Sequence, residues 1–120
     1  MPIVYLLGMN KNLKEHNQDL GKKLAVLGSP IRMQILQILT EREHCACEFP
    51  DLLQISQPNT SRNLNVLKRA GLISSYRDGQ RIIYSLDVEK LKSIQKSLNE
   101  LIDSYSGLTF VLQDKCKKEI

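Results

Sequence analysis

The sequence predicts a mainly α-helical fold with one two-stranded β-hairpin, the winged helix-turn-helix. Two short helical segments separated by a break at Ile55-Ser56 form a helix-turn-helix. Two segments rich in β-branched and aromatic residues then flank Asp78-Gly79, a two-residue hairpin signal. Amphipathic helices precede and follow this unit. Since 120 residues with 42% hydrophobic residues suit one core, we expect a single domain over residues 1–120.

Two amphipathic helices are expected before the helix-turn-helix. Leucines spaced by seven, four and three residues place one apolar stripe on residues 11–27, where Gly21 marks either a kink or the end of a helix. Ser29-Pro30 then starts a second helix, with Ser as the N-cap and Pro in the first position. The apolar residues of this second helix share one face, so we expect it to be buried.

The helix-turn-helix itself is bounded by prolines and a glycine. Pro50 is tolerated only in a first turn, because in a helix interior it costs about 3 kcal/mol, so a helix should run from close to Cys47 to about Leu53. Ser56 is the expected N-cap of the next helix, which ends at Ala70-Gly71.

The hairpin and a long last helix complete the fold. Strands are expected over residues 72–77 and 81–86, with Asp78-Gly79 as a type I′ turn between them. From Asp87 onward apolar residues recur every three or four positions to near Gly107, and residues 107–120 are either a further helix or a tail. Short helices and a hairpin cannot cover all this apolar surface, so we expect this last helix to pair with its mate in a dimer.

Composition limits the class of protein and its compartment. Seventeen Lys and Arg against 13 Asp and Glu give a net charge of +4, a mild bias toward polyanionic partners. Three cysteines, an odd number, argue against a secreted disulfide framework, and the start of the chain resembles neither a signal peptide nor a membrane span. We expect a cytoplasmic protein with no membrane partner. The chain has no catalytic combination of Asp or Glu with His, no Ser-His-Asp set and no phosphate loop, so an enzyme is not expected.

The polar opening of the helix after Ser56 is the candidate DNA-reading segment. Gln and Asn can pair with adenine, Arg with guanine, and Ser or Thr with bases or phosphates. Cations on the hairpin and at the far end of the helix can meet phosphates beside the groove. We expect the partner to be double-stranded operator DNA, contacted by Ser56, Gln57, Asn59, Thr60, Ser61, Arg62, Asn63, Lys68, Arg77, Gln80 and Arg81. The alternatives are an ordinary solvated capping turn and a winged helix that binds protein instead of DNA.

Four segments together resemble the ArsR/SmtB family of metal-sensing repressors: the helix from close to Cys47 to about Leu53, Ser-Gln-Pro-Asn-Thr-Ser-Arg at 56–62, Leu-Lys-Arg-Ala-Gly-Leu at 67–72, and Tyr-Arg-Asp-Gly-Gln-Arg-Ile-Ile-Tyr-Ser-Leu at 76–86. The resemblance covers about residues 24–86. It implies a homodimer, built by the first and last helices, that leaves a twofold-related operator when a metal or metalloid binds. By motif position, Gln57, Ser61 and Arg62 fall where such proteins contact bases and backbone. Many members have His where this chain has Arg62, so its operator preference should differ.

The cysteines carry the expected effector site. Cys45-Ala46-Cys47 resembles the Cys-x-Cys of arsenic- and cadmium-type sensors of the family, in position as well as in residues. On a regular helix two such side chains point about 200° apart, but at a helix start they can converge. Thiolates suit soft metals and trivalent arsenic or antimony. We therefore expect no permanently bound cofactor and an effector ion that is As(III) or Sb(III), with Cd or Zn as alternatives.

The ligand set departs from the family pattern. The third cysteine of the best-known arsenic-type motif is replaced by Pro50, so Cys116 is the remaining thiol that can complete a trigonal site, and His44 is a possible fourth ligand. Cys116 is equally well a free surface cysteine, and Cys45 and Cys47 are alternatively inert core residues. Another alternative is a redox switch through a disulfide that involves Cys116. A direct bond between Cys45 and Cys47 is less expected, because it closes a strained small ring.

Overall fold

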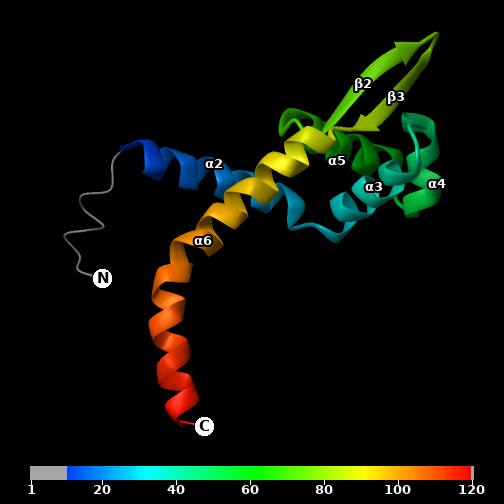
Figure 1. Ribbon diagram of the computed structural model, residues 1–120. Coiled ribbons are helices and arrows are strands. Elements are labelled where there is room, and N and C mark those ends of the chain that lie inside the picture. The colour runs from blue at the N-terminus through cyan, green and yellow to red at the C-terminus, as the bar shows by residue number, and fades with distance from the viewer. Residues whose placement is uncertain (1–10, 120) are drawn as a thin grey trace.

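The computed structural model describes the backbone of residues 11–119 and the side-chain surroundings of residues 13–105. The elements follow one another as expected for a winged helix-turn-helix, which confirms the fold class (Figure 1). In chain order they are α2 (Lys11–Leu27), α3 (Pro30–Glu41), β1 (His44–Cys45), the 3₁₀ turn η1 (Ala46–Glu48), α4 (Phe49–Leu53), α5 (Gln57–Arg69), β2 (Ile73–Asp78), β3 (Arg81–Leu86) and α6 (Val88–Glu119).

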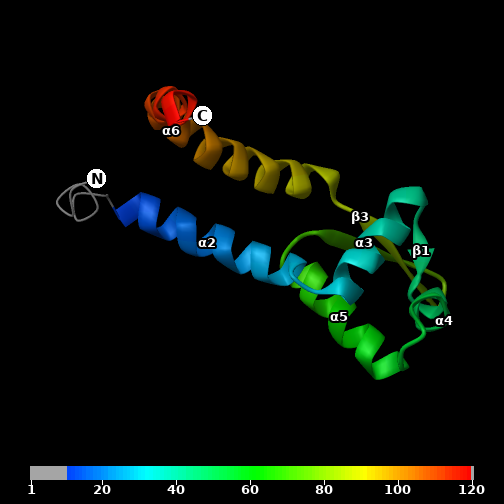
Figure 2. The ribbon, with the colours of Figure 1, turned by 90° about the horizontal axis from the view of Figure 1, so that it is seen from below.

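The helices form a body from which two features extend. The β2–β3 hairpin projects from the body formed by α3, α4 and α5, and α6 leads away from it (Figure 1). Seen from below, α2 and the first turns of α6 run side by side (Figure 2), and the two helices are in contact. Within the described residues, no helix has the length and apolarity needed to cross a membrane.

Two serine caps start helices as the sequence indicates. Ser29 Oγ accepts a hydrogen bond from the Arg32 N–H at 3.4 Å, and Ser56 Oγ accepts one from the Asn59 N–H at 3.2 Å. Each cap is followed by a proline in the first turn, where the missing N–H costs nothing. Gly21, by contrast, neither ends nor interrupts α2, which continues to Leu27.

The hairpin turn lies one residue further along than expected. Asp78 pairs with Arg81, so the two turn residues are Gly79 and Gln80 instead of Asp78 and Gly79. Gly79 has a φ of +66° and Gln80 has no positive φ, which is the pattern of a type II′ turn and not of type I′. The type I′ expectation is therefore wrong, and Asp78 is the last residue of β2.

A third strand, absent from the sequence-based expectation, joins the hairpin. The sheet order is β1-β3-β2, with all pairs antiparallel. In β1, His44 lies opposite Tyr84 and Cys45 opposite Ile83. This pairing attaches the cysteine segment to the base of the wing, the β2–β3 hairpin.

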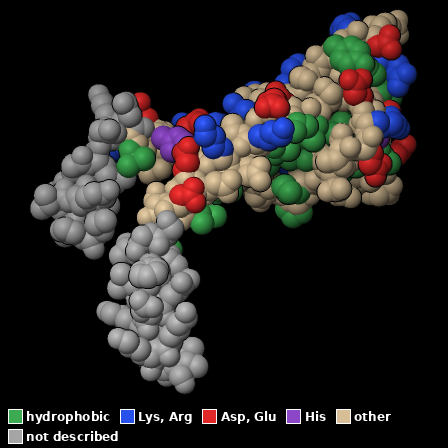
Figure 3. Space-filling model, in the orientation of Figure 1, with side chains coloured by type: hydrophobic (Ala, Val, Ile, Leu, Met, Phe, Trp, Pro, Cys, Tyr) green, Lys and Arg blue, Asp and Glu red, His purple; other side chains and the backbone are tan. Residues whose placement is uncertain are grey.

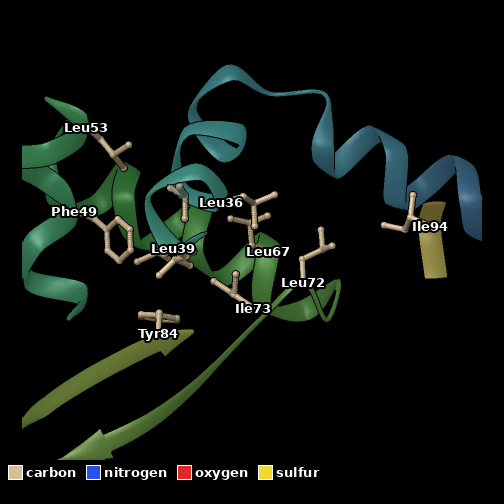
Figure 4. Packing of buried hydrophobic residues seen from close by; sticks show 11 residues of the cluster. Leu36, Leu39, Phe49, Leu53, Leu67, Leu72, Ile73, Tyr84 and Ile94 are labelled. Atoms are coloured by element: carbon tan, nitrogen blue, oxygen red, sulfur yellow. The ribbon is translucent and has the colours of Figure 1, made fainter. Parts of the chain in front are cut away.

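The core lies where α3, α4, α5 and the strands meet. Ile35, Phe49, Leu67 and Leu72 are fully buried within it. Figure 4 shows the cluster, in which Ile94 of α6 lies apart from the rest, beside α2. The last helix extends to Glu119, so the expectation that it ends near Gly107 is wrong. Helix, and not a loose tail, follows Gly107.

Truncation of a core leucine is expected to destabilise the fold strongly. Leu67→Ala removes a fully buried side chain and leaves a cavity, so the free energy of unfolding should fall by about 2–5 kcal/mol. The matched control is Leu52→Ala, whose side chain is 48% exposed. Urea unfolding followed by circular dichroism measures both; equal losses in the two variants would contradict this core assignment.

Candidate nucleic-acid interface

The first turns of α5 carry an exposed polar surface. Gln57, Ser61 and Arg62 are exposed, and Gln57 and Ser61 lie one helical turn apart on the same face. Ser56, the N-cap residue, is exposed, and Asn59 is half-buried. Amide, hydroxyl and guanidinium groups therefore stand together at one helix end, which is the chemistry of major-groove readout.

Two residues of the expected DNA-reading set face inward instead. Thr60 and Asn63 are only 2% and 7% exposed. Thr60 Oγ1 donates to the Ser56 carbonyl at 2.9 Å, and Asn63 Nδ2 donates to both the carbonyl and Oδ1 of Asn59, each at 2.9 Å. The helical period turns these two positions toward the core, so in this structure they shape α5 and are not exposed contacts.

Arg32 holds α5 against the preceding helices, a role that the sequence analysis missed. Its Nη1 donates to Asn63 Oδ1 at 3.1 Å, and its Nε donates to the Val26 carbonyl at 2.6 Å. A further donation from Nη2 reaches the Ala25 carbonyl at 3.5 Å. No periodicity of α3 marks this arginine, because its partners come from α2 and α5. It fixes the orientation of α5.

The wing presents the remaining basic candidates. Arg77, Gln80 and Arg81 are exposed on the hairpin, and Lys68 is exposed near the far end of α5. Figure 3 shows basic side chains along the hairpin, with acidic ones between them. The Tyr76 hydroxyl donates to Glu43 Oε2 at 2.6 Å, which ties the wing to the segment after α3 and raises the pKa of Tyr76.

The cysteine segment runs from β1 into η1. Cys45 is 3% exposed and Cys47 is exposed. Cys45 has an extended backbone, with φ −69° and ψ 143°, and η1 begins only at Ala46, so the two side chains converge as expected for a helix start. Their sulfur atoms are joined in a disulfide, which corrects the expectation that the small ring disfavours this bond. The Cys47 N–H also donates to Cys45 Sγ at 3.3 Å.

Glu48 lies among three basic side chains and the cysteine backbone. Its Oε1 accepts from the Cys45 N–H at 3.1 Å, and its Oε2 accepts from Arg42 Nη2 at 2.9 Å. Arg81 Nη2 lies 4.0 Å from Oε1, and His44 Nε2 lies 3.8 Å from Oε2. The hydrogen bond from Arg42, followed by that from Cys45, lowers the pKa of Glu48. A carboxylate thus links the cysteine segment to the wing.

The further metal ligands expected from sequence are not assembled in the described part of the chain. There, no group of three or more His, Cys, Asp or Glu side chains is placed to hold a metal ion. His44 is buried, its Nδ1 lies 2.9 Å from the Arg42 carbonyl oxygen, and its ring lies 5.8 Å from that of Phe49. Cys116 is in the helical backbone of α6, and its side chain lies outside the described residues.

A cleft of about 230 Å³ brings the separate candidates together. Cys45 and Cys47 line it from the cysteine segment, Gln57 and Ser61 from α5, and Gln80 and Arg81 from the wing. A chemical event at the cysteines therefore takes place directly against the side chains suited to reading DNA. The sequence predicted these residues singly, and the fold places them around one cleft.

Comparisons with known proteins identify the family of this chain. The model of the bacterial regulatory protein, arsR family, matches residues 29–75. An uncharacterized HTH-type transcriptional regulator of Methanocaldococcus jannaschii is 36% identical over 75 residues, which span 62% of this chain and 84% of that protein. The arsenical resistance operon repressor of Staphylococcus xylosus is 32% identical over 90 residues, 75% of this chain and 86% of that one.

Solved structures show the same fold. The crystal structure of NolR from Sinorhizobium fredii matches with a TM-score of 0.65 and 27% identity, over 81% of this chain and 94% of that one. This chain covers most of the length of these sequence relatives, and it shares the winged helix-turn-helix fold. Together these two findings establish its family. The chain belongs to the ArsR/SmtB family of bacterial transcriptional regulators, which are DNA-binding proteins and not enzymes.

Proposed function

We propose that this chain is a homodimeric repressor that binds double-stranded operator DNA and is released when a thiophilic ion, As(III) or Sb(III) first among them, binds its cysteine thiolates. The observation that carries the proposal is the cleft shared by Cys45, Cys47, Gln57 and Arg81. The whole of residues 1–120 would act as one DNA-binding domain in the cytoplasm. Two arsenic- or metal-resistance regulators among the relatives support this choice of effector class.

The DNA contacts would come from α5 and the wing. Gln57, Ser61 and Arg62 would read base edges or backbone, since they are exposed on the opening turns of α5. Arg77 and Arg81 would meet phosphates from the hairpin. Thr60 and Asn63 leave the contact set because they are buried, and the full proposed set is Ser56, Gln57, Asn59, Ser61, Arg62, Lys68, Arg77, Gln80 and Arg81.

The effector site would use two adjacent sulfurs. Cys47 is exposed and gives an ion access, while Cys45 is held in the sheet by its pairing with Ile83. Trivalent arsenic bonded to thiolates is pyramidal and takes a third ligand, for which we propose Cys116. Cd or Zn would require further ligands beside these two sulfurs.

A redox-sensing repressor is the second candidate, and the Cys45–Cys47 disulfide favours it. Oxidation of both thiols by a peroxide would form the S–S bond, while the two electrons and two protons reduce the peroxide to water or an alcohol and water. The same reaction would remove both thiolate ligands. Oxidation and ion binding thus compete for one pair of sulfurs.

Loss of Arg62 is expected to weaken operator binding. Arg62→Ala removes an exposed guanidinium from the reading helix, so affinity for the chain's own upstream promoter DNA should fall by about 5- to 150-fold, the effect of one base-reading contact. Lys96→Ala, an exposed cation on α6, is the control for net charge. Fluorescence anisotropy measures both, and equal affinities in the two variants would argue against α5 as the reading helix.

Arsenite or antimonite is expected to release the reduced protein from DNA. A coupling of about 1–3 kcal/mol corresponds to a 5- to 150-fold loss of affinity in the wild type, which Cys47→Ser should abolish. Cys116→Ser tests the third ligand, cadmium and zinc test the other ions, and a peroxide arm tests the redox candidate. DNA binding that is indifferent to all four ions would reject the metal-sensing part and leave DNA binding intact.

The dimer is expected to depend on the exposed apolar residues of α6. Leu101 and Ile102 are each 65% exposed, on a helix that runs beside α2 (Figure 2). Leu101→Glu should shift the protein to monomers in sedimentation velocity, because it would bury a charge in the interface. Lys96→Glu, about 140° around the helix from Leu101, is the control. A dimer that survives Leu101→Glu unchanged would place the interface elsewhere.

A further inference from the structure

We propose that Glu48 is a positioning residue that withholds Arg81 from DNA when the two cysteine sulfurs are bridged. The inference rests on the proposed function, because it takes Arg81 to be a phosphate contact. It assigns Glu48 a regulatory role distinct from metal binding and from base reading.

The position of Arg81 allows such control. It is the first residue of β3, next to the turn of the wing, and its side chain is 58% exposed. Its guanidinium lies 4.0 Å from Glu48 Oε1 and within the lining of the cleft. A guanidinium engaged by this carboxylate is turned toward the cleft, and a DNA phosphate has to compete with the carboxylate for it.

Glu48 is itself held on both of its oxygens. Its side chain is 27% exposed, and Arg42 binds Oε2 at 2.9 Å. The Cys45 N–H donates to Oε1, the oxygen nearest to Arg81. The carboxylate is therefore fixed by the backbone of a cysteine, and a displacement of that cysteine moves the anion that faces Arg81.

Hydrogen bonds connect the cysteine segment to the Glu48 carboxylate. The Cys47 N–H donates to Cys45 Sγ while Glu48 accepts from the Cys45 N–H, so the sulfur and the carboxylate belong to one capping box. A bridge between the sulfurs, by a disulfide or by an ion, keeps the hydrogen bonds of this capping box in place. When the thiols are separate, the cysteine backbone no longer fixes the Glu48 carboxylate, and Arg81 becomes free to bind a phosphate.

The experiment measures the slope of log affinity against log salt concentration, whose magnitude is about 0.9 for each phosphate that the protein neutralises on double-stranded DNA. It uses the 120-residue chain with Cys116→Ser, either reduced or treated with diamide. The azo group of diamide takes up the two electrons and two protons that Cys45 and Cys47 release as their S–S bond forms. The oxidised protein should have the shallower slope, by about 0.9 per DNA-bound protomer.

The decisive variant is Glu48→Gln. The amide keeps an oxygen that can accept from the Cys45 N–H but removes the charge that attracts Arg81. Oxidised Glu48→Gln should regain the steep slope of the reduced protein, and Arg81→Ala should abolish that gain. Glu43→Gln is the matched control, because Glu43 binds Tyr76 of the wing. Thermal unfolding of each variant reports any purely structural effect, which would lower stability without a change in slope.

The outcomes separate this inference from the proposed function. Equal slopes for oxidised and reduced protein, or a difference that persists in Glu48→Gln, would overturn the role of Glu48 and leave DNA binding by the wing in place. A slope that is unchanged by Arg81→Ala in the reduced protein would instead remove the wing contact of the proposed function, and the role of Glu48 with it.

Discussion

The pairing of β1 with β3 is the constraint on which the site depends. Two residues, His44 and Cys45, continue the wing sheet beyond the hairpin by pairing with Tyr84 and Ile83. Next to this strand Phe49 is fully buried, and its ring lies 6.4 Å from that of Tyr84 in an edge-on arrangement. This strand is the backbone connection that places the cysteine segment beside the wing, where both line the cleft.

A second constraint comes from Arg32, which holds α5, the helix that lines the cleft opposite the cysteine segment and the wing. One guanidinium binds carbonyls of α2 and the Asn63 amide of α5, so α5 is held at a defined angle to α2. In a dimer built by α2 and α6, that angle determines how far apart the two reading helices stand. In the proposed dimer, Arg32 would thus help to set the distance between the half-sites.

Most features set by near neighbours can be predicted from the sequence, the type of the hairpin turn excepted, whereas features set by distant residues cannot. The caps at Ser29 and Ser56 involve residues within one turn, and both form as expected. Gly107 is a weak helix end, since one glycine costs only about 1 kcal/mol in a helix interior. By contrast, β1 exists only through β3, and Arg32 meets Asn63 across 31 positions. The polar run of α5 marks the correct segment, but only packing shows which of its side chains can face a partner.

The modest charge of the chain makes a single ion pair important. A net charge of +4 leaves little general attraction to DNA, so the proposed binding would depend on a few local cations, Arg81 among them. One phosphate contact changes affinity by about 3- to 4-fold between 50 and 200 mM salt, and two equivalent contacts in a dimer by about 12-fold. Withdrawing Arg81 from both protomers would therefore remove about this 12-fold salt dependence without moving α5. A carboxylate beside the cysteines is positioned for such a modest switch, because it acts on the wing while the core stays folded.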